Sequence, residues 1–289
     1  MIEDITQRLF SQVPRDSLYH YTSLSGLLGI VGSGVLRSSD IRYMNDSAEL
    51  RHTLDLLGNH VRQRLIAGTD QPALLNQLLE WLSHRVVSGP MLFVASFRAN
   101  GNLLSQWRGY SVHGKGVSLG FDPAHIQACA EEQLFQVGKC LYDSAEQAQL
   151  IEKIVDALET MAEKADVDDE EEAVWNGIFE RIEGRLLRIA GILKHPAFEE
   201  EQEWRIVSPV IDSCADAPVF FREGVSMLVP YYAFNLATVA GQALQLDHVY
   251  LGPTSNVDLS MKSLELYLAS SGASPRRGVS YCQIPYRQR

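Results

Sequence analysis

The chain has 289 residues, of which 46% are hydrophobic, and 36 acidic against 25 basic side chains give a formal net charge of -11. This length and apolar content suffice for one large domain or two small ones with a sizeable core. The acidic balance and the lack of a strongly basic window disfavour tight, sequence-independent nucleic-acid binding as the main activity.

The first part of the chain alternates extended and helical patterns. Residues 18–21 form a short aromatic strand, and Thr22 is the expected N-cap of a helix that ends at a glycine-rich stop. A second extended segment follows at residues 35–43. Asn45 or Asp46 is then the natural N-cap of the next helix.

Two helices and two strands follow. Apolar residues recur at helical spacing in residues 46–66 and 73–87. Continuous apolar runs at residues 91–97 and 116–121 have strand length and imply a central sheet. The connection between these two strands is rich in glycine, asparagine and then aromatic residues, and we expect a loop there.

A long helical segment interrupts the strands. Residues 144–165 carry an amphipathic pattern that opens with Ser144 and Gln147, a capping pair. The acidic run 166–172 joins this helix to a second one. We therefore predict a helical hairpin inserted at about residues 144–193.

Strand character returns in the last third of the chain. The expected strands cover residues 205–210, 225–229, 248–251 and 279–284. No Pro/Ser-rich linker, low-complexity segment or internal repeat divides the chain. We predict a single α+β domain over residues 1–289, with helical insertions.

Cysteine spacing and the N-terminus indicate the compartment. The cysteines are Cys129, Cys140, Cys214 and Cys282. Neither they nor the histidines show a metal-ligand spacing, so we expect reduced thiols and no metal. Acids occupy the start of the chain, where a signal peptide needs bases, and no apolar run approaches the roughly 20 residues that span a bilayer. We expect a cytoplasmic protein without a membrane partner.

An acidic segment at residues 198–207 runs into a strand. If that strand begins near Glu201, alternation places Glu201, Glu203 and Arg205 on one face. Two carboxylates beside a fixed cation suggest a site where charge develops. The alternative is an acidic loop that leads into a half-buried strand with an internal Glu–Arg pair.

Two other segments carry candidate ligand contacts. Alternation directs His20 and Thr22 to the same side of their strand, where an imidazole and a hydroxyl group can grip a ribose or an amide. A structural histidine is the alternative. Further along, Trp107 and Tyr110 either stack on a planar ligand or cover the edge of the core.

Together these segments resemble a bacterial family known as domain of unknown function 2971. The matching pieces are residues 18–23, residues 43–46 with Glu49, Ser105 with Trp107 and Tyr110, residues 116–122, and residues 198–205. They extend over most of the chain. As a set they are fairly specific, although the family has no established activity.

The order of these motifs is also similar to the ADP-ribosyltransferase superfamily. This more remote resemblance implies a mixed, mainly antiparallel central sheet and NAD as co-substrate. It places His20 and Thr22 at the adenosine ribose and nicotinamide. Tyr43 and Tyr110 compete for the aromatic position that stacks on nicotinamide.

The same resemblance assigns the acidic motif. Glu203 would hold the nicotinamide ribose and stabilise an oxocarbenium-like state as the nicotinamide–ribosyl bond breaks. Glu201 would accept the proton of the incoming nucleophile. Arg205 or Arg42 would meet the pyrophosphate through paired hydrogen bonds.

These assignments imply an NAD-dependent ADP-ribosyltransferase-like enzyme, of toxin or phage-defence type, that modifies a protein or a nucleic acid. The alternatives are a catalytically inactive nucleotide-sensing or protein-interaction domain of the same fold, and an NAD glycohydrolase or nuclease-like hydrolase. The acceptor, the formation of a homo-oligomer and the role of the 144–193 helices stay open. We predict that Glu203→Gln abolishes turnover and leaves the fold intact.

Overall fold

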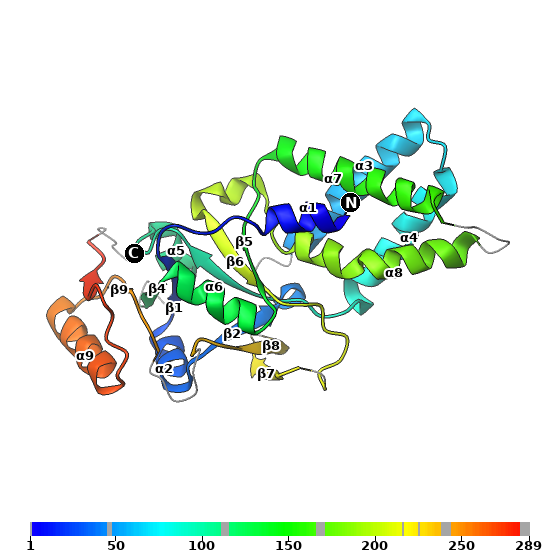
Figure 1. The fold of residues 1–289 in the computed structure, drawn as a ribbon. Coiled ribbons are helices and arrows are strands. Elements are labelled where there is room, and N and C mark those ends of the chain that lie inside the picture. Colours follow the sequence, from blue (N-terminus) through cyan, green and yellow to red (C-terminus); the bar gives the residue numbers. More distant parts are fainter. Residues whose placement is uncertain are drawn as a thin grey trace.

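A computed structural model describes residues 2–44, 48–110, 116–165, 171–215, 217–224, 226–237 and 244–283. Within these ranges the chain forms an open sheet with helices packed against it and a separate layer of helices beside it (Figure 1). None of the helices found there combines the length and apolar character that crossing a membrane requires.

The strands form one sheet. They are β1 (Leu18–Thr22), β2 (Val35–Asp40), β3 (Phe93–Arg98), β4 (Val117–Phe121), β5 (Gln136–Lys139), β6 (Glu203–Val207), β7 (Val219–Glu223), β8 (Leu228–Asn235), β9 (His248–Leu251) and β10 (Val279–Tyr281). Their order is β10-β9-β4-β1-β3-β2-β8-β7, and β6 pairs with both β3 and β5. Among these named strands only β9 and β10 run parallel. The expected α+β class and the mixed, mainly antiparallel sheet are therefore confirmed.

The helices belong to two groups. They are α1 (Ile2–Leu9), α2 (Leu24–Ser33), α3 (Ala48–Ala67), α4 (Pro72–Ser88), α5 (Leu104–Tyr110), α6 (Pro123–Glu132), α7 (Ser144–Glu163), α8 (Glu171–Ala190) and α9 (Val257–Ser270). Two short 3-10 helices, η1 (Ile41–Tyr43) and η2 (Pro196–Glu201), precede α3 and β6. Helices α2, α5, α6 and α9 pack against the sheet, whereas α1, α3, α4, α7 and α8 form the separate layer.

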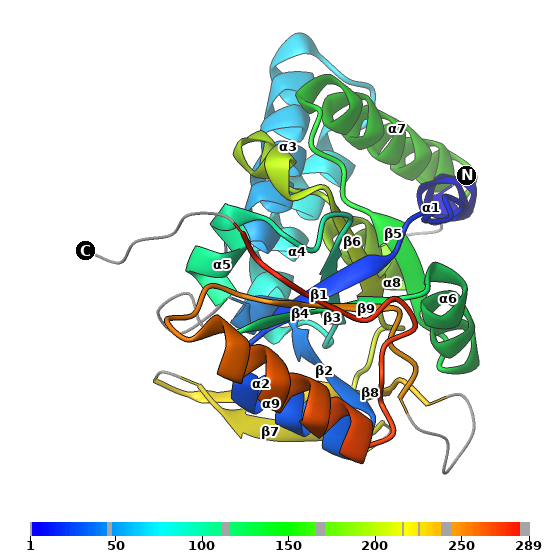
Figure 2. The ribbon, with the colours of Figure 1, turned by 90° about the vertical axis from the view of Figure 1, so that its left-hand side faces the viewer.

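One face of the sheet forms the main core. Alternating strand residues such as Phe97, Ile206 and Phe234 are fully buried against Ile126 of α6 and Leu264 of α9. Helices α2 and α9 lie side by side under this face (Figure 2). Burial of this apolar surface is the main free-energy gain that fixes the sheet and orients its other face.

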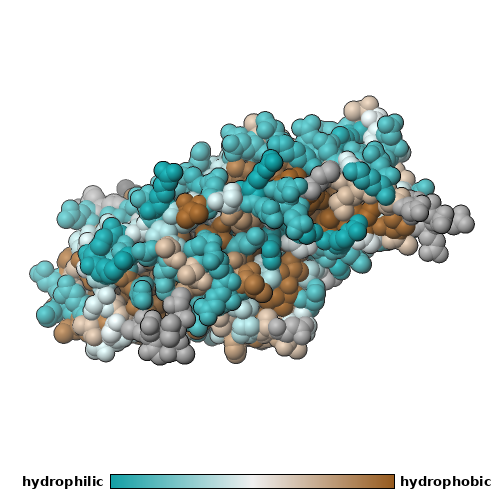
Figure 3. Space-filling model, in the orientation of Figure 1, coloured by the Kyte–Doolittle hydropathy of each residue, from teal (hydrophilic) through white to brown (hydrophobic). Residues whose placement is uncertain are grey.

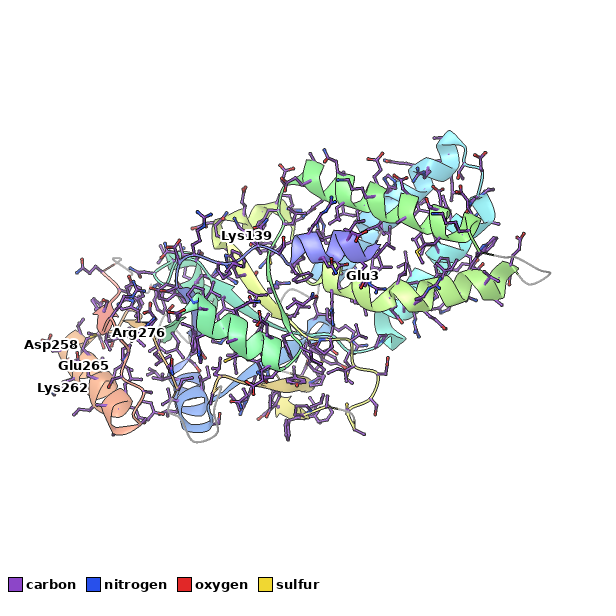
Figure 4. The ribbon with its side chains drawn as sticks, viewed as in Figure 1. Glu3, Lys139, Asp258, Lys262, Glu265 and Arg276 are labelled. Carbon is purple, nitrogen blue, oxygen red and sulfur yellow. The ribbon has the colours of Figure 1, made fainter. Side chains whose placement is uncertain are left out.

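Helix α9 shows how the pattern of a helix sets its orientation. Leu264 and Leu268 are buried one turn apart, so they face the core. The charged residues Asp258, Lys262 and Glu265 follow the opposite side of the helix and point away from the sheet (Figure 4). In the same view, hydrophilic residues cover most of the molecular surface, with smaller hydrophobic patches between them (Figure 3).

The separate helical layer has its own hydrophobic core. Val61 of α3, Leu75 of α4, Val155 and Leu158 of α7, and Phe179 of α8 are fully buried there. The predicted helical pair at 144–193 is present as α7 and α8. It packs with α3, α4 and α1 rather than standing alone, because each of these helices has an apolar face that needs a partner.

The sheet forks at β3, and this fork makes the pocket. Along one edge of β3, β1 pairs at Arg98 and β2 pairs at Phe93 and Val94. Strand β6 occupies the other edge from Val94 to Arg98. Two strands thus share one edge of β3 and diverge between Ala95 and Phe97.

Several predicted boundaries are wrong for local reasons. Thr22 stays in β1, and Ser23 caps α2 by accepting a hydrogen bond from the Gly26 amide. Likewise Asp143, not Ser144, caps α7. In both cases the residue next to the predicted cap has the extended backbone that places its side-chain oxygen near the free helix amides.

Other segments also differ from expectation. The predicted loop at 105–110 is helix α5, and the predicted extended segment 35–43 ends at Asp40, whose carboxylate caps η1 by accepting from the Arg42 amide. The expected strand at 225–229 overlaps β8 only at Leu228 and Val229, while Val225 lies outside the described residues. Strand β7, the partner of β8, was not predicted. Asn45 and Asp46, the predicted caps of α3, lie outside the described residues.

Candidate functional site

A pocket with a cavity volume of about 310 Å³ lies where β1 and β2 diverge. Side chains from β1, β2, η1, β3, α5, β6 and β7 line it, together with residues that follow β1, η1 and α8. The volume falls at the lower end of the roughly 300–1,000 Å³ found for ligand pockets. The fork in the sheet therefore produces a cleft large enough for a small molecule.

His20 fills part of the gap along the edge of β3. Its Nδ1 lies 3.0 Å from the main-chain oxygen of Ser96. Because a carbonyl oxygen only accepts, Nδ1 carries the proton and Nε2 is left as the acceptor nitrogen. Burial lowers the pKa of His20. A neutral imidazole thus stands beside Thr22 on the pocket wall.

The charge of the pocket is its most distinctive property. Five basic residues line it: Arg37, Arg98, Lys194, Arg205 and Arg222. No aspartate or glutamate is among the lining residues that the structure describes. In a chain with a formal net charge of -11, this is a local reversal of sign. Such a cleft attracts anions.

Three of these cations surround the Glu203 carboxylate. Its Oε1 lies 2.8 Å from Arg205 Nε and 3.1 Å from Arg98 Nη1. Its Oε2 lies 2.5 Å from Lys194 Nζ and 3.3 Å from Arg205 Nη2. The Glu203 side chain is 0% exposed. Burial favours the neutral acid, but Arg205, Arg98 and Lys194 together outweigh it and hold the pKa of Glu203 well below its usual range.

Glu201 joins the same cluster from the end of η2. Its Oε2 lies 2.9 Å from Arg98 Nη2 and 2.5 Å from Lys194 Nζ, and the side chain is 14% exposed. The strand begins at Glu203, two residues later than predicted, because Gln202 adopts a left-handed backbone with a φ of 41°. Three cations and two carboxylates leave this group of five residues one net positive charge.

The two remaining arginines form the rim of the pocket. Arg222 on β7 donates from Nη2 to the Ser39 hydroxyl of β2 at 3.4 Å. The Arg37 guanidinium lies 5.1 Å from the centre of the Tyr231 ring. Both arginines are less buried than the three inside the cluster. The rim therefore adds positive charge at the entrance.

The structure brings some predicted residues together. His20, Thr22, Tyr43 and Arg205 all line the pocket. Glu203 and Arg205 share one face of β6, as alternation predicted, while Trp204 on the opposite face faces the core. These residues come from β1, η1 and β6, so the fork of the sheet is what joins them.

Other predicted contacts are placed elsewhere. Trp107 is not on the pocket wall, since it is buried against Tyr21 and donates from Nε1 to Asn102. Arg42 pairs with Asp40 through two contacts of 3.0 and 2.7 Å rather than facing the pocket. Trp107 thus takes the core position that was one of its two alternatives, and Arg42, predicted as a phosphate contact, has a structural partner. The Tyr110 side chain lies outside the described part of the structure.

Sequence reasoning missed most of the cations. Arg98 had a signal, because a charged residue that ends an apolar strand needs a buried partner or a ligand. Gln106 accepts from Arg98 Nε at 3.2 Å and so fixes that guanidinium from α5. No local sequence pattern marks Lys194, Arg37 or Arg222 as a site residue. Only the fold brings them to one cleft.

Metal-ligating groups do not gather in the described ranges. No three histidine, cysteine, aspartate or glutamate side chains lie close enough there to hold a metal ion. Of the four cysteines, Cys214 is exposed, and Cys129, Cys140 and Cys282 are buried.

Comparison with known proteins identifies one segment. Residues 106–206, from α5 to β6, match the sequence model of a family described as Protein of unknown function (DUF2971). This segment contributes Gln106, Lys194 and Arg205 to the pocket. No curated protein and no solved structure matches the chain significantly.

Proposed function

We propose that this protein binds a phosphate-bearing nucleotide in the pocket at the fork of the sheet, with NAD as the leading candidate. The observation that carries the proposal is the set of five basic side chains on the pocket wall. Charge-assisted hydrogen bonds from arginine and lysine are the usual means by which proteins hold phosphate groups.

Two neighbouring features are consistent with a nucleotide, one for its phosphates and one for its ribose. The α2 helix begins at the pocket, where Thr22 and its N-cap Ser23 are lining residues, and a helix N-terminus favours negative charge. His20 adds a neutral imidazole whose acceptor nitrogen suits a ribose hydroxyl.

ADP-ribosyl transfer from NAD to a protein or nucleic-acid acceptor is the second candidate. The presence of His20 and Thr22 beside Arg205 in one pocket favours it, as the superfamily resemblance expects. Glu203 does not favour it, because each of its oxygens is held by cationic groups and the side chain is buried. Glu201 is the more accessible carboxylate of the cluster, but it is not among the residues that line the pocket.

Titration calorimetry with NAD on the wild type, on Arg222→Ala and on Arg62→Ala tests the binding proposal. Arg62 is an exposed arginine of α3, away from the pocket lining, and serves as the control. Loss of one charge-assisted contact should weaken binding about tenfold or more in Arg222→Ala and leave Arg62→Ala unchanged.

The same samples decide between binding and chemistry. Nicotinamide release that requires cell lysate indicates transfer to an acceptor, and release without lysate indicates hydrolysis. Binding without release under either condition supports a nucleotide-sensing domain. If neither NAD nor pyrophosphate binds the wild type, the proposed function is wrong.

A further inference from the structure

We propose that the sheet surface formed by the exposed Phe220 and the half-buried Tyr231 is the subsite for the base of the bound nucleotide. This inference rests on the proposed function, because it places the base next to the arginines that would hold the phosphates. The aromatic base is then the part of the ligand that the protein recognises outside the pocket.

Strand pairing puts the residues of this subsite on one face. Tyr231 of β8 stands opposite Phe220 of β7 and opposite Ser39 of β2. Arg222 lies two positions after Phe220, and Arg37 two positions before Ser39, so alternation directs both arginines to the same face. Since Arg37, Ser39 and Arg222 line the pocket, the aromatic pair continues the pocket wall outward.

The aromatic pair is arranged as a platform. The Phe220 and Tyr231 rings have centroids 5.9 Å apart with an angle of 31° between their planes, and the Arg37 guanidinium lies 5.1 Å from the Tyr231 centroid. Phe220 is 50% exposed. Exposed aromatic rings flanked by arginine on a sheet face are the surfaces on which bases stack in single-stranded nucleic-acid binding proteins.

The charges favour a nucleotide over a second copy of the chain. A symmetric contact through this face would place Arg37 and Arg222 of both copies in one interface, and like charges oppose association. A nucleotide instead offers a phosphate to the arginines and a ring to Phe220. Phe220 and Arg222 are about 7 Å apart along the strand, which is of the order of the distance between a base and its own 5′-phosphate.

Phe221 provides a matched control. It is the next residue of the same strand, it is 56% exposed, and alternation directs it to the opposite face of the sheet. Replacing either phenylalanine removes the same atoms from the same hairpin. Only Phe220 adjoins the pocket wall.

The test is calorimetric binding of ADP and of inorganic pyrophosphate to the wild type, Phe220→Ala, Phe220→Trp and Phe221→Ala. ADP should bind the wild type more tightly than pyrophosphate does. Phe220→Ala should weaken ADP binding about tenfold and leave pyrophosphate binding unchanged, because it removes only the stacked ring. Phe220→Trp should keep ADP binding, and Phe221→Ala should behave like the wild type.

Three results would overturn the inference while leaving phosphate binding in place. The first is equal affinity of the wild type for ADP and for pyrophosphate. The second is an equal loss of ADP affinity in Phe220→Ala and Phe221→Ala. The third is unchanged ADP affinity in Phe220→Ala together with a change of oligomeric mass in sedimentation. The last result would identify the patch as a contact between protein chains. Failure of pyrophosphate to bind the wild type would instead contradict the proposed function.

Discussion

Glu203 explains how three cations can be held together inside this protein. Like charges at such short separation repel strongly in a buried site, and desolvation adds to that cost. The carboxylate of Glu203 contacts Arg98, Lys194 and Arg205 at once and offsets both effects. Its role is therefore to position the cations of the pocket, with Glu201 assisting from η2.

The sequence led us to expect that Glu203→Gln leaves the fold intact, but the buried position of Glu203 changes that expectation. The substitution should lower the free energy of unfolding at pH 7 by about 3–5 kcal/mol, because it leaves buried cations without their counter-charge. Urea unfolding followed by circular dichroism measures this. Glu200→Gln, an exposed residue of η2, is the control and should change stability by less than about 0.5 kcal/mol. Similar small effects of both substitutions would show that the cluster does not need Glu203.

The same carboxylate predicts a pH dependence. The pKa of Glu203 is lowered well below its ordinary value of 4.5 in the folded protein, so the unfolded chain binds this proton first as the pH falls. The stabilisation is complete above about pH 4.5 and is lost as the pH falls toward the folded-state pKa. As the pH is lowered from 6 to 3, the free energy of unfolding should fall less steeply in Glu203→Gln than in the wild type. Parallel curves would contradict the assignment.

At the scale of elements, the divergence of β1 from β2 depends on how β1 is held by β4. Gly120 of β4 stands opposite Tyr19 of β1. A Cβ atom at Gly120 would lie 2.7 Å from the Tyr19 ring and 2.8 Å from the main-chain oxygen of His248 in β9. Only glycine allows these three strands to approach so closely, and their packing fixes β1 beside the pocket.

Gly120→Ala should therefore destabilise the protein by about 1–3 kcal/mol, because the backbone of β9 has to move. Gly29→Ala is the contrasting change. Gly29 is exposed within α2, and a Cβ there meets no atom within 4 Å. It should stabilise the protein by about 0.5–1 kcal/mol through helix propensity. Thermal unfolding of both variants checks this, and a loss of stability no larger in Gly120→Ala than in Gly29→Ala would refute the packing argument.

At the scale of the whole molecule, two hydrophobic cores meet close to the pocket. The sheet core and the helical core are distinct clusters of buried residues. Lys194 follows α8 of the helical layer and reaches Glu203 in the sheet, so one ion pair of the cluster connects the two parts. The helical layer thus contributes directly to the charge of the pocket.

The prediction of a single domain can be tested through this connection. Leu158→Ala opens a cavity in the helical core and should cost about 2–5 kcal/mol. If the chain unfolds as one unit, hydrogen exchange at the slowest amides of β4 should accelerate as much as at those of α7. The reciprocal variant Leu119→Ala in β4 should affect α7 in the same way. Acceleration confined to the mutated part would indicate two domains.

Local patterns predicted most of the helices and strands but few of the pocket residues. The apolar periodicity of α3, α4, α7 and α8 is strong because each buries one face. Strand β7 was not predicted because it is an edge strand with two exposed phenylalanines and lacks an apolar–polar alternation. For Trp107 the sequence left a ligand contact and a core position open, because a loop was expected there. Helix formation in α5 places the side chain in the core.

By itself, the sequence determined the α+β class, the helical pair, and the shared face of Glu203 and Arg205, because each depends on residues within a few positions of one another. The tertiary structure alone decided that Arg37 and Arg222 meet Arg98 and its neighbours in one cleft. It also decided that Glu203 is buried between cations. These facts depend on strands far apart in the chain that pair around a forked β3, and side-chain burial and charge pairing are properties of that packing.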